Sequence, residues 1–121
     1  MILALSLTPE TSGVIDAVAL SAMRDDAWLL NVGRGGHVVT DDLVSALRRG
    51  AIAGAVLDVT DPEPLPDGHP LWSFENCVIT PHVGNTAAMG LPLIADRVKE
   101  NVARWIAGDA LAGPVDVGLG Y

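Results

Sequence analysis

The fold of this chain is constrained most by one segment, in which an apolar run ends at an arginine flanked by glycines, Asn31-Val32-Gly33-Arg34-Gly35-Gly36. Residues 27–32 predict a buried strand and residues 40–49 predict a helix, so Arg34 lies where a strand gives way to a loop. Open α/β sheets bind ligands at such strand ends. The glycines allow close approach of a ligand, and a guanidinium group can bind a carboxylate with two parallel hydrogen bonds. The segment predicts either an anion site or an arginine in a glycine-rich turn that faces water.

Short apolar segments alternate with amphipathic ones along most of the chain. The pattern predicts strands over residues 2–7, 27–32, 51–59 and 77–80, and helices over residues 16–23, 40–49 and 91–106, with Pro92 in the first turn of the last helix. This alternation is typical of an α/β fold with a parallel sheet. Residues 60–76 interrupt it with four prolines, and a loop of that length inside a compact domain is usually functional.

Composition excludes several classes of partner. The formal net charge of −8 argues against nucleic acids and anionic membranes, because phosphate binding relies on clustered Lys and Arg. Cys77 is the only cysteine, so an internal disulfide is excluded, and we expect it to be a core thiol at the start of a strand. No apolar run approaches the roughly 20 residues that span a bilayer, and no leader is evident. We therefore expect a soluble, cytoplasmic protein without a metal site.

Three predicted strand ends each carry a candidate functional group. Arg34 follows the second strand, Asp58 and then Glu63 follow the third, and His82 follows the fourth. Parallel strands bring such residues to a common edge, where a cation, a carboxylate and an imidazole can hold an anionic substrate and move a proton. We expect Glu63, which lies between two prolines, to hydrogen-bond His82 and favour its charged form. The alternatives are that Glu63 is a solvated loop residue and that His82 caps the following helix.

The other two histidines are weaker candidates. His37 follows two glycines where no partner is evident. His69 lies in the proline-rich loop, where a surface role is expected.

Four segments resemble consecutive motifs of the D-isomer-specific 2-hydroxyacid dehydrogenases. They are Leu5-Ser6-Leu7-Thr8-Pro9-Glu10-Thr11, Asn31-Val32-Gly33-Arg34-Gly35-Gly36, Gly54-Ala55-Val56-Leu57-Asp58-Val59 with Asp61-Pro62-Glu63-Pro64, and Thr80-Pro81-His82. Their order and the separations between Arg34, Glu63 and His82 also match the family. The resemblance extends from Leu3 to about Ile106.

The resemblance implies a hydride transfer between a nicotinamide cofactor, NAD or NADP, and a small D-2-hydroxy acid or 2-oxo acid. Arg34 would bind the carboxylate of the acid, His82 would be the general acid and base, and Glu63 would orient and charge His82. Asp58 would bind the nicotinamide carboxamide. The implied cofactor contacts are Leu5, Ser6, Val32, Gly33, Arg34, Asp58, His82 and Gly84. A glutamate at position 63 favours the hydroxyacid branch, since the formate-oxidising branch usually has glutamine there.

Other features depart from the family pattern. The family's Gly-x-Gly-x-x-Gly turn lies upstream of the point where this sequence begins, and Thr60 replaces a commonly aromatic residue. The resemblance therefore predicts a partial Rossmann-type sheet, with residues 1–88 as the second half of the NAD(P)-binding domain. Residues 89–121 would be the C-terminal helix and tail that pack on an absent catalytic domain. We expect the isolated chain to form homo-oligomers through its exposed sheet edge and to show little turnover. The alternatives are a non-catalytic, corepressor-like dinucleotide-binding module and a truncated remnant.

Overall fold

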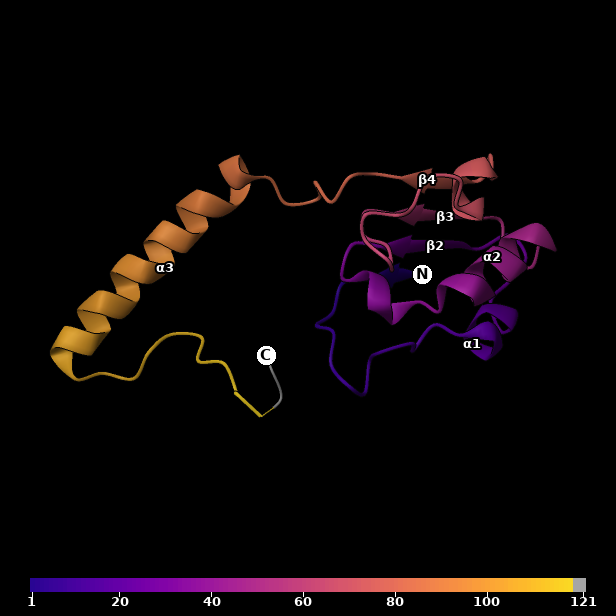
Figure 1. Ribbon diagram of the computed structural model, residues 1–121. Coiled ribbons are helices and arrows are strands. Elements are labelled where there is room, and N and C mark those ends of the chain that lie inside the picture. The colour runs from indigo at the N-terminus through magenta and orange to yellow at the C-terminus, as the bar shows by residue number, and fades with distance from the viewer. Residues whose placement is uncertain (119–121) are drawn as a thin grey trace. The chain divides into compact units, whose positions relative to one another are not determined.

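The computed structural model describes residues 1–118 and divides the chain into two compact units, Met1–Val83 and the residues from Gly84 onward. The first unit contains a parallel sheet with the strand order β1-β2-β3-β4 (Figure 1). Its strands are β1 (Ile2–Leu3), β2 (Trp28–Asn31), β3 (Gly54–Leu57) and β4 (Cys77–Ile79). The predicted α/β class with parallel strands is confirmed.

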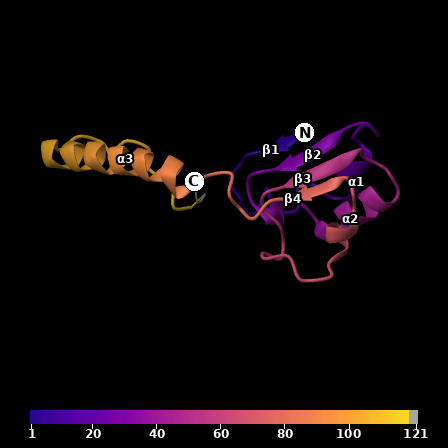
Figure 2. The same ribbon diagram turned by 90° about the horizontal axis from the view of Figure 1, so that it is seen from above.

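Two helices connect the first three strands. Helix α1 (Ala17–Ser21) joins β1 to β2, and α2 (Thr40–Arg48) joins β2 to β3. The two helices lie together on one face of the sheet and contact each other (Figures 1 and 2). This follows from the strand order, because successive right-handed crossovers in one direction along a sheet place their helices on the same face. Asp16, the first residue of the predicted helix, caps α1 by accepting a hydrogen bond from the Ala19 N–H at 2.8 Å.

The sheet buries one face and leaves aliphatic side chains on the other. On the helix-covered face, Leu29, Ala55 and Leu57 are almost fully buried. Ile2, Leu30, Val56 and Val78 are paired in register across the four strands, so their side chains share the opposite face. At the two ends of this row, Ile2 is 66% exposed and Val78 is 48% exposed. We call these four residues the outer row.

The observed elements are shorter or displaced relative to the predicted ones. The first strand ends at Leu3 rather than residue 7, and β3 begins at Gly54 rather than residue 51. The long loop contains a short 3-10 helix, η2 (Pro70–Ser73), and a second one, η1 (Gly35–His37), follows β2. Thr40 is the first residue of α2, and its hydroxyl donates to the Asp61 carbonyl oxygen at 2.6 Å.

The second unit is built on helix α3 (Ala87–Ala107). The helix begins one turn earlier than predicted, with Thr86 as its N-cap, so Pro92 lies inside the helix rather than in its first turn. Gly108 ends it with a φ of 78°, a left-handed conformation that glycine adopts without strain. Among the described helices, none is both long enough and apolar enough to cross a membrane. The tail predicted to reach Tyr121 includes three residues, 119–121, that lie outside the described range.

Candidate active site

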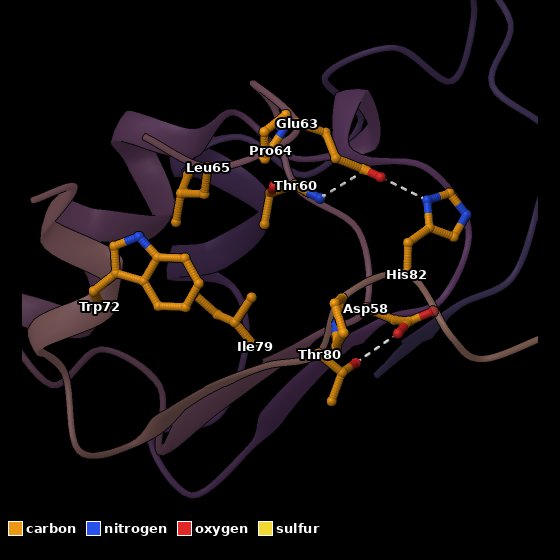
Figure 3. A pocket seen from close by; sticks show the side chains of 10 residues that line it. Asp58, Thr60, Glu63, Pro64, Leu65, Trp72, Ile79, Thr80 and His82 are labelled. Carbon is orange, nitrogen blue, oxygen red and sulfur yellow. Dashed lines mark hydrogen bonds and ion pairs between the residues drawn. The ribbon is translucent and has the colours of Figure 1, made fainter. Parts of the chain in front are cut away.

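His82 and Glu63 are in direct polar contact at the carboxyl ends of the strands. The Nδ1 atom of His82 lies 2.6 Å from Oε1 of Glu63, so the expected hydrogen bond is present (Figure 3). This bond is the main reason why the pKa of the Glu63 carboxyl lies below its ordinary value, and the Thr60 N–H, 3.4 Å from Oε2, acts in the same direction. Glu63 therefore remains a carboxylate beside the imidazole at neutral pH.

The backbone of His82 is unusual. Its φ is 54°, in the left-handed region that few residues other than glycine adopt. Backbone strain of this kind is concentrated at functional sites. Thr86, rather than His82, caps α3, which excludes the capping alternative for His82.

Asp58 links the ends of β3 and β4. Its side chain is buried, and Oδ1 accepts a hydrogen bond from the Thr80 hydroxyl at 2.6 Å (Figure 3). The same oxygen accepts the Val83 N–H at 2.9 Å. These bonds connect the end of β3 to Thr80 and Val83, which flank His82 in the chain.

A pocket of about 340 Å³ opens beside the Glu63–His82 pair. Its volume is in the range of small-molecule sites, which are mostly apolar with a few convergent polar groups. Figure 3 shows that the indole of Trp72 and the side chain of Ile79 line the part of the pocket away from His82. The lining residues are Asp58, Thr60, Glu63, Pro64, Leu65, Trp72, Ile79, Thr80, Pro81 and His82.

Arg34 lies at the same edge but does not line this pocket. It is exposed, and its Nη1 donates to the Gly33 carbonyl oxygen at 2.8 Å. Its positive charge nevertheless contributes to lowering the pKa of Glu63. The structure thus brings Arg34, Glu63 and His82 to one rim of the sheet.

Gly35 explains how the arginine loop and the Glu63 loop come together. A Cβ atom at position 35 would lie 1.9 Å from the Thr60 carbonyl oxygen and 2.6 Å from the Asp61 nitrogen. Both are backbone atoms that cannot rotate away. Only glycine permits this contact between the two loops.

We expect Gly35→Ala to destabilise the chain by about 1–3 kcal/mol, because the methyl group must push the two loops apart. Urea unfolding followed by circular dichroism measures the effect. Gly36→Ala is the matched control, since the nearest atom to a Cβ there would be the flexible end of Leu7 at 3.1 Å rather than a backbone atom. Equal stability of the two variants would contradict the role assigned to Gly35.

The residues predicted to contact a cofactor are mostly exposed. Leu5, Ser6 and Val32 are exposed, whereas Gly33 is buried. A Cβ on Gly33 would lie 3.2 Å from the Leu5 carbonyl oxygen, so the segments that follow β1 and β2 are in close contact. Gly84 belongs to the second unit.

Sequence reasoning missed the environment of two histidines. His37 is fully buried, and its Nδ1 accepts the Arg34 N–H at 3.2 Å, so the interpretation that it lacks a partner is wrong. His69 is half-buried and caps η2 by accepting the Leu71 N–H at 3.3 Å. Cys77 begins β4 as predicted, and burial raises the pKa of its thiol to about 11. Within residues 1–118, no group of His, Cys, Asp or Glu is arranged to hold a metal ion.

Comparison with known proteins identifies the family. Residues 1–84 match the model of the D-isomer specific 2-hydroxyacid dehydrogenase NAD binding domain. The chain is 44% identical over 115 residues to glyoxylate/hydroxypyruvate reductase A of Serratia proteamaculans, covering 94% of this chain and 36% of that protein.

Two solved structures have the same fold. One is a D-isomer specific 2-hydroxyacid dehydrogenase of Xanthobacter autotrophicus in complex with NADPH and MES, with a TM-score of 0.91, 41% identity, and coverage of 99% of this chain and 38% of that one. The other is an NADPH-dependent glyoxylate/hydroxypyruvate reductase of Sinorhizobium meliloti in complex with NADP and malonate, with a TM-score of 0.79, 36% identity, and coverage of 94% and 35%. The chain thus spans little more than a third of the length of these relatives. It belongs to the D-isomer specific 2-hydroxyacid dehydrogenase family, of whose NAD-binding domain it forms a part.

Proposed function

We propose that this chain is the C-terminal portion of an NAD(P)-dependent dehydrogenase that interconverts a small 2-oxo acid and the D-2-hydroxy acid. The observation that carries the proposal is the 2.6 Å contact between Glu63 and His82 at the rim of the pocket. Because Nδ1 of His82 is bonded to a carboxylate, Nε2 is the ring atom that gives its proton to the substrate. The family membership and the shared rim of Arg34, Glu63 and His82 support the same assignment.

The chain's own residues bind the acid and move one proton. Arg34 binds the substrate carboxylate through its guanidinium. His82 protonates the carbonyl oxygen as reduction proceeds and accepts the proton from the hydroxyl in the reverse direction. Glu63 stabilises the imidazolium and fixes the orientation of the ring. The bound nicotinamide supplies or accepts the hydride.

The strand ends offer suitable groups for the cofactor. The exposed residues Leu5, Ser6 and Val32 and the close approach permitted by Gly33 would hold it. The carboxylate of Asp58, an acceptor, is matched to the donor N–H groups of a carboxamide. The proposed cofactor is NAD or NADP. NADPH is the first choice for a test, since the Xanthobacter structure contains NADPH and the Sinorhizobium structure contains NADP.

The similar proteins and the cationic Arg34 support a small 2-oxo acid as the substrate class. The Serratia relative is a glyoxylate/hydroxypyruvate reductase, and the Sinorhizobium structure holds malonate, a small acid. We therefore propose glyoxylate and hydroxypyruvate as the first substrates to test.

The test uses a hybrid protein in which this chain replaces the matching C-terminal segment of the Serratia reductase. We expect it to oxidise NADPH, followed at 340 nm, when glyoxylate is added. A hybrid that folds and binds NADPH without turnover would support the corepressor-like alternative instead. A folded hybrid that neither binds nor reacts would mark the chain as a truncated remnant.

The isolated chain should self-associate and show little turnover. The outer row forms an exposed aliphatic surface on a parallel sheet, a type of sheet that is normally covered on both faces. We expect light scattering after size exclusion to give a mass above that of the monomer. Val78→Lys should reduce the mass, whereas Val18→Lys, at a 74% exposed position on α1, should not. A monomeric parent chain, or a monomer that reduces NAD with 2-hydroxy acids, would overturn this prediction.

Replacing Glu63 with glutamine should alter the pH dependence of the hybrid. Below its lowered pKa, Glu63 takes up a proton and loses the charge that holds the His82 ring, whereas glutamine does not titrate. The fall in kcat that the parent shows on the acid side should therefore be absent from the Glu63→Gln hybrid. The pair's contribution to stability is complete above the ordinary carboxyl pKa of 4.5 and is lost as the pH falls through the lowered pKa of Glu63. Profiles of kcat against pH for the two proteins measure the difference, and superimposable profiles would contradict it.

A further inference from the structure

Two buried polar side chains support the loop that carries Arg34, and the proposed reaction uses neither of them. Asn31 ends β2 and is 1% exposed, while His37 ends η1 and is 0% exposed. Buried polar side chains are retained in a core where their hydrogen bonds compensate for lost hydration. The contacts of these two therefore indicate what they do.

Both backbone polar groups of Arg34 are bonded to these side chains. The N–H of Arg34 donates to Nδ1 of His37 at 3.2 Å, and its carbonyl oxygen accepts from Nδ2 of Asn31 at 2.9 Å. Oδ1 of Asn31 also accepts the Gly33 N–H at 3.1 Å. Since β2 ends at Asn31, these bonds replace the strand ladder at the residue that carries the guanidinium.

The bond to Arg34 sets the tautomer of His37. Because Nδ1 accepts, the neutral ring carries its proton on Nε2. Nε2 is buried and has no hydrogen-bond partner among the described residues. The ring packs tightly on Gly33, where a Cβ would lie 3.0 Å from Cε1 of His37. An aliphatic residue would avoid the unpaired Nε2, but it would leave the Arg34 N–H without its acceptor.

We propose that Asn31 and His37 are positioning residues, which hold the backbone of Arg34 from inside the fold so that its guanidinium is presented at the rim of the sheet. The identity of the bound anion, a 2-oxo acid carboxylate, rests on the proposed function. The support of Arg34 by the two side chains does not depend on it.

The first experiment measures hydrogen–deuterium exchange of the 121-residue chain by mass spectrometry, resolved to single amides by electron-transfer fragmentation. His37→Leu removes the acceptor with little change in volume, whereas His37→Asn places an amide oxygen near the position of Nδ1. We expect the Arg34 amide to exchange about tenfold faster in His37→Leu and near the parent rate in His37→Asn. The Ala55 amide, bonded to the Asn76 carbonyl oxygen, is the internal control.

A second variant, Gly33→Ala, tests the proposal if His37→Leu does not fold. Gly33→Ala would press a methyl group on the ring of His37, and it should also speed exchange at Arg34. Exchange at Arg34 that is unchanged in every folded variant, or equally raised in His37→Leu and His37→Asn, would overturn the proposal.

The hybrid provides a functional measurement. His37→Leu should raise the KM for glyoxylate about tenfold, with kcat and the KM for NADPH changed much less, and His37→Asn should restore most of the loss. An unchanged KM for glyoxylate in an active hybrid would overturn the positioning role. If the parent hybrid is inactive, that result counts only against the proposed function. The exchange measurement still tests whether His37 holds the backbone of Arg34.

Discussion

In the hybrid protein, His82→Asn will lower kcat for glyoxylate reduction by about two to four orders of magnitude, the usual contribution of a general acid. Asparagine places a side-chain atom close to Nδ1 and can still bond to Glu63, but its amide N–H is too weak an acid to protonate the substrate. Binding of NADPH should survive, because the side chain is small and Asp58 still links the strand ends through Thr80 and Val83. Stopped-flow absorbance gives the rate, and quenching of protein fluorescence by NADPH gives the affinity.

His69→Asn is the matched control. His69 caps η2 with its Nδ1 atom, and the oxygen of asparagine can accept the same Leu71 N–H. This variant should retain the parent kcat. If His82→Asn kept more than about a tenth of the parent kcat, the assignment of His82 as the general acid would be wrong.

The part of the fold that depends on periodicity and strand ends could be predicted from the sequence. The positions of Arg34, Asp58 and His82 just after apolar runs were sufficient to place them at one edge, because parallel strands all end there. The pairing of Glu63 with His82 also followed, since the loop after β3 and the segment after β4 both begin at that edge.

Contacts that depend on close backbone packing could not be predicted. The partner of His37 is a backbone N–H three residues earlier, which is reached only because residues 35–37 form a 3-10 turn. The contact of Gly35 with the Thr60 carbonyl depends on how two loops pack, and no local pattern encodes it. Helix α3 starts before Pro92 because Thr86 provides a cap, a signal that the apolar spacing from Leu91 onward does not contain.

The buried and the exposed residues of the site have different roles. The buried residues Asn31, Gly35 and His37 fix the arginine loop, whereas Arg34, Glu63 and His82 remain exposed. Side chains that bind a substrate must be accessible to it. Their positions are therefore set by neighbouring residues that can be buried. Substitutions in the buried set should act on substrate affinity through geometry, and those in the exposed set should act on the reaction directly.

Arg34→Lys in the hybrid will raise the KM for glyoxylate about a hundredfold. Lysine retains the charge but loses the planar pair of donors that bind both oxygens of a carboxylate. The lost hydrogen bonding to a charged group corresponds to about 1.5–3 kcal/mol. Steady-state kinetics with glyoxylate varied at saturating NADPH measures the effect.

Two further variants separate the geometry of Arg34 from its charge. Arg34 contributes to lowering the pKa of Glu63 through its positive charge, and lysine preserves that contribution whereas glutamine does not. The profile of kcat against pH should therefore be the same for the parent and Arg34→Lys and should change for Arg34→Gln. Arg24→Lys is the control for a generic arginine change, because Arg24 is exposed and pairs only with Asp26 among the ion pairs of the described residues. If Arg34→Lys retained the parent KM for glyoxylate, bidentate carboxylate binding at the sheet edge would be wrong, and Arg34 would act on Glu63 by charge alone.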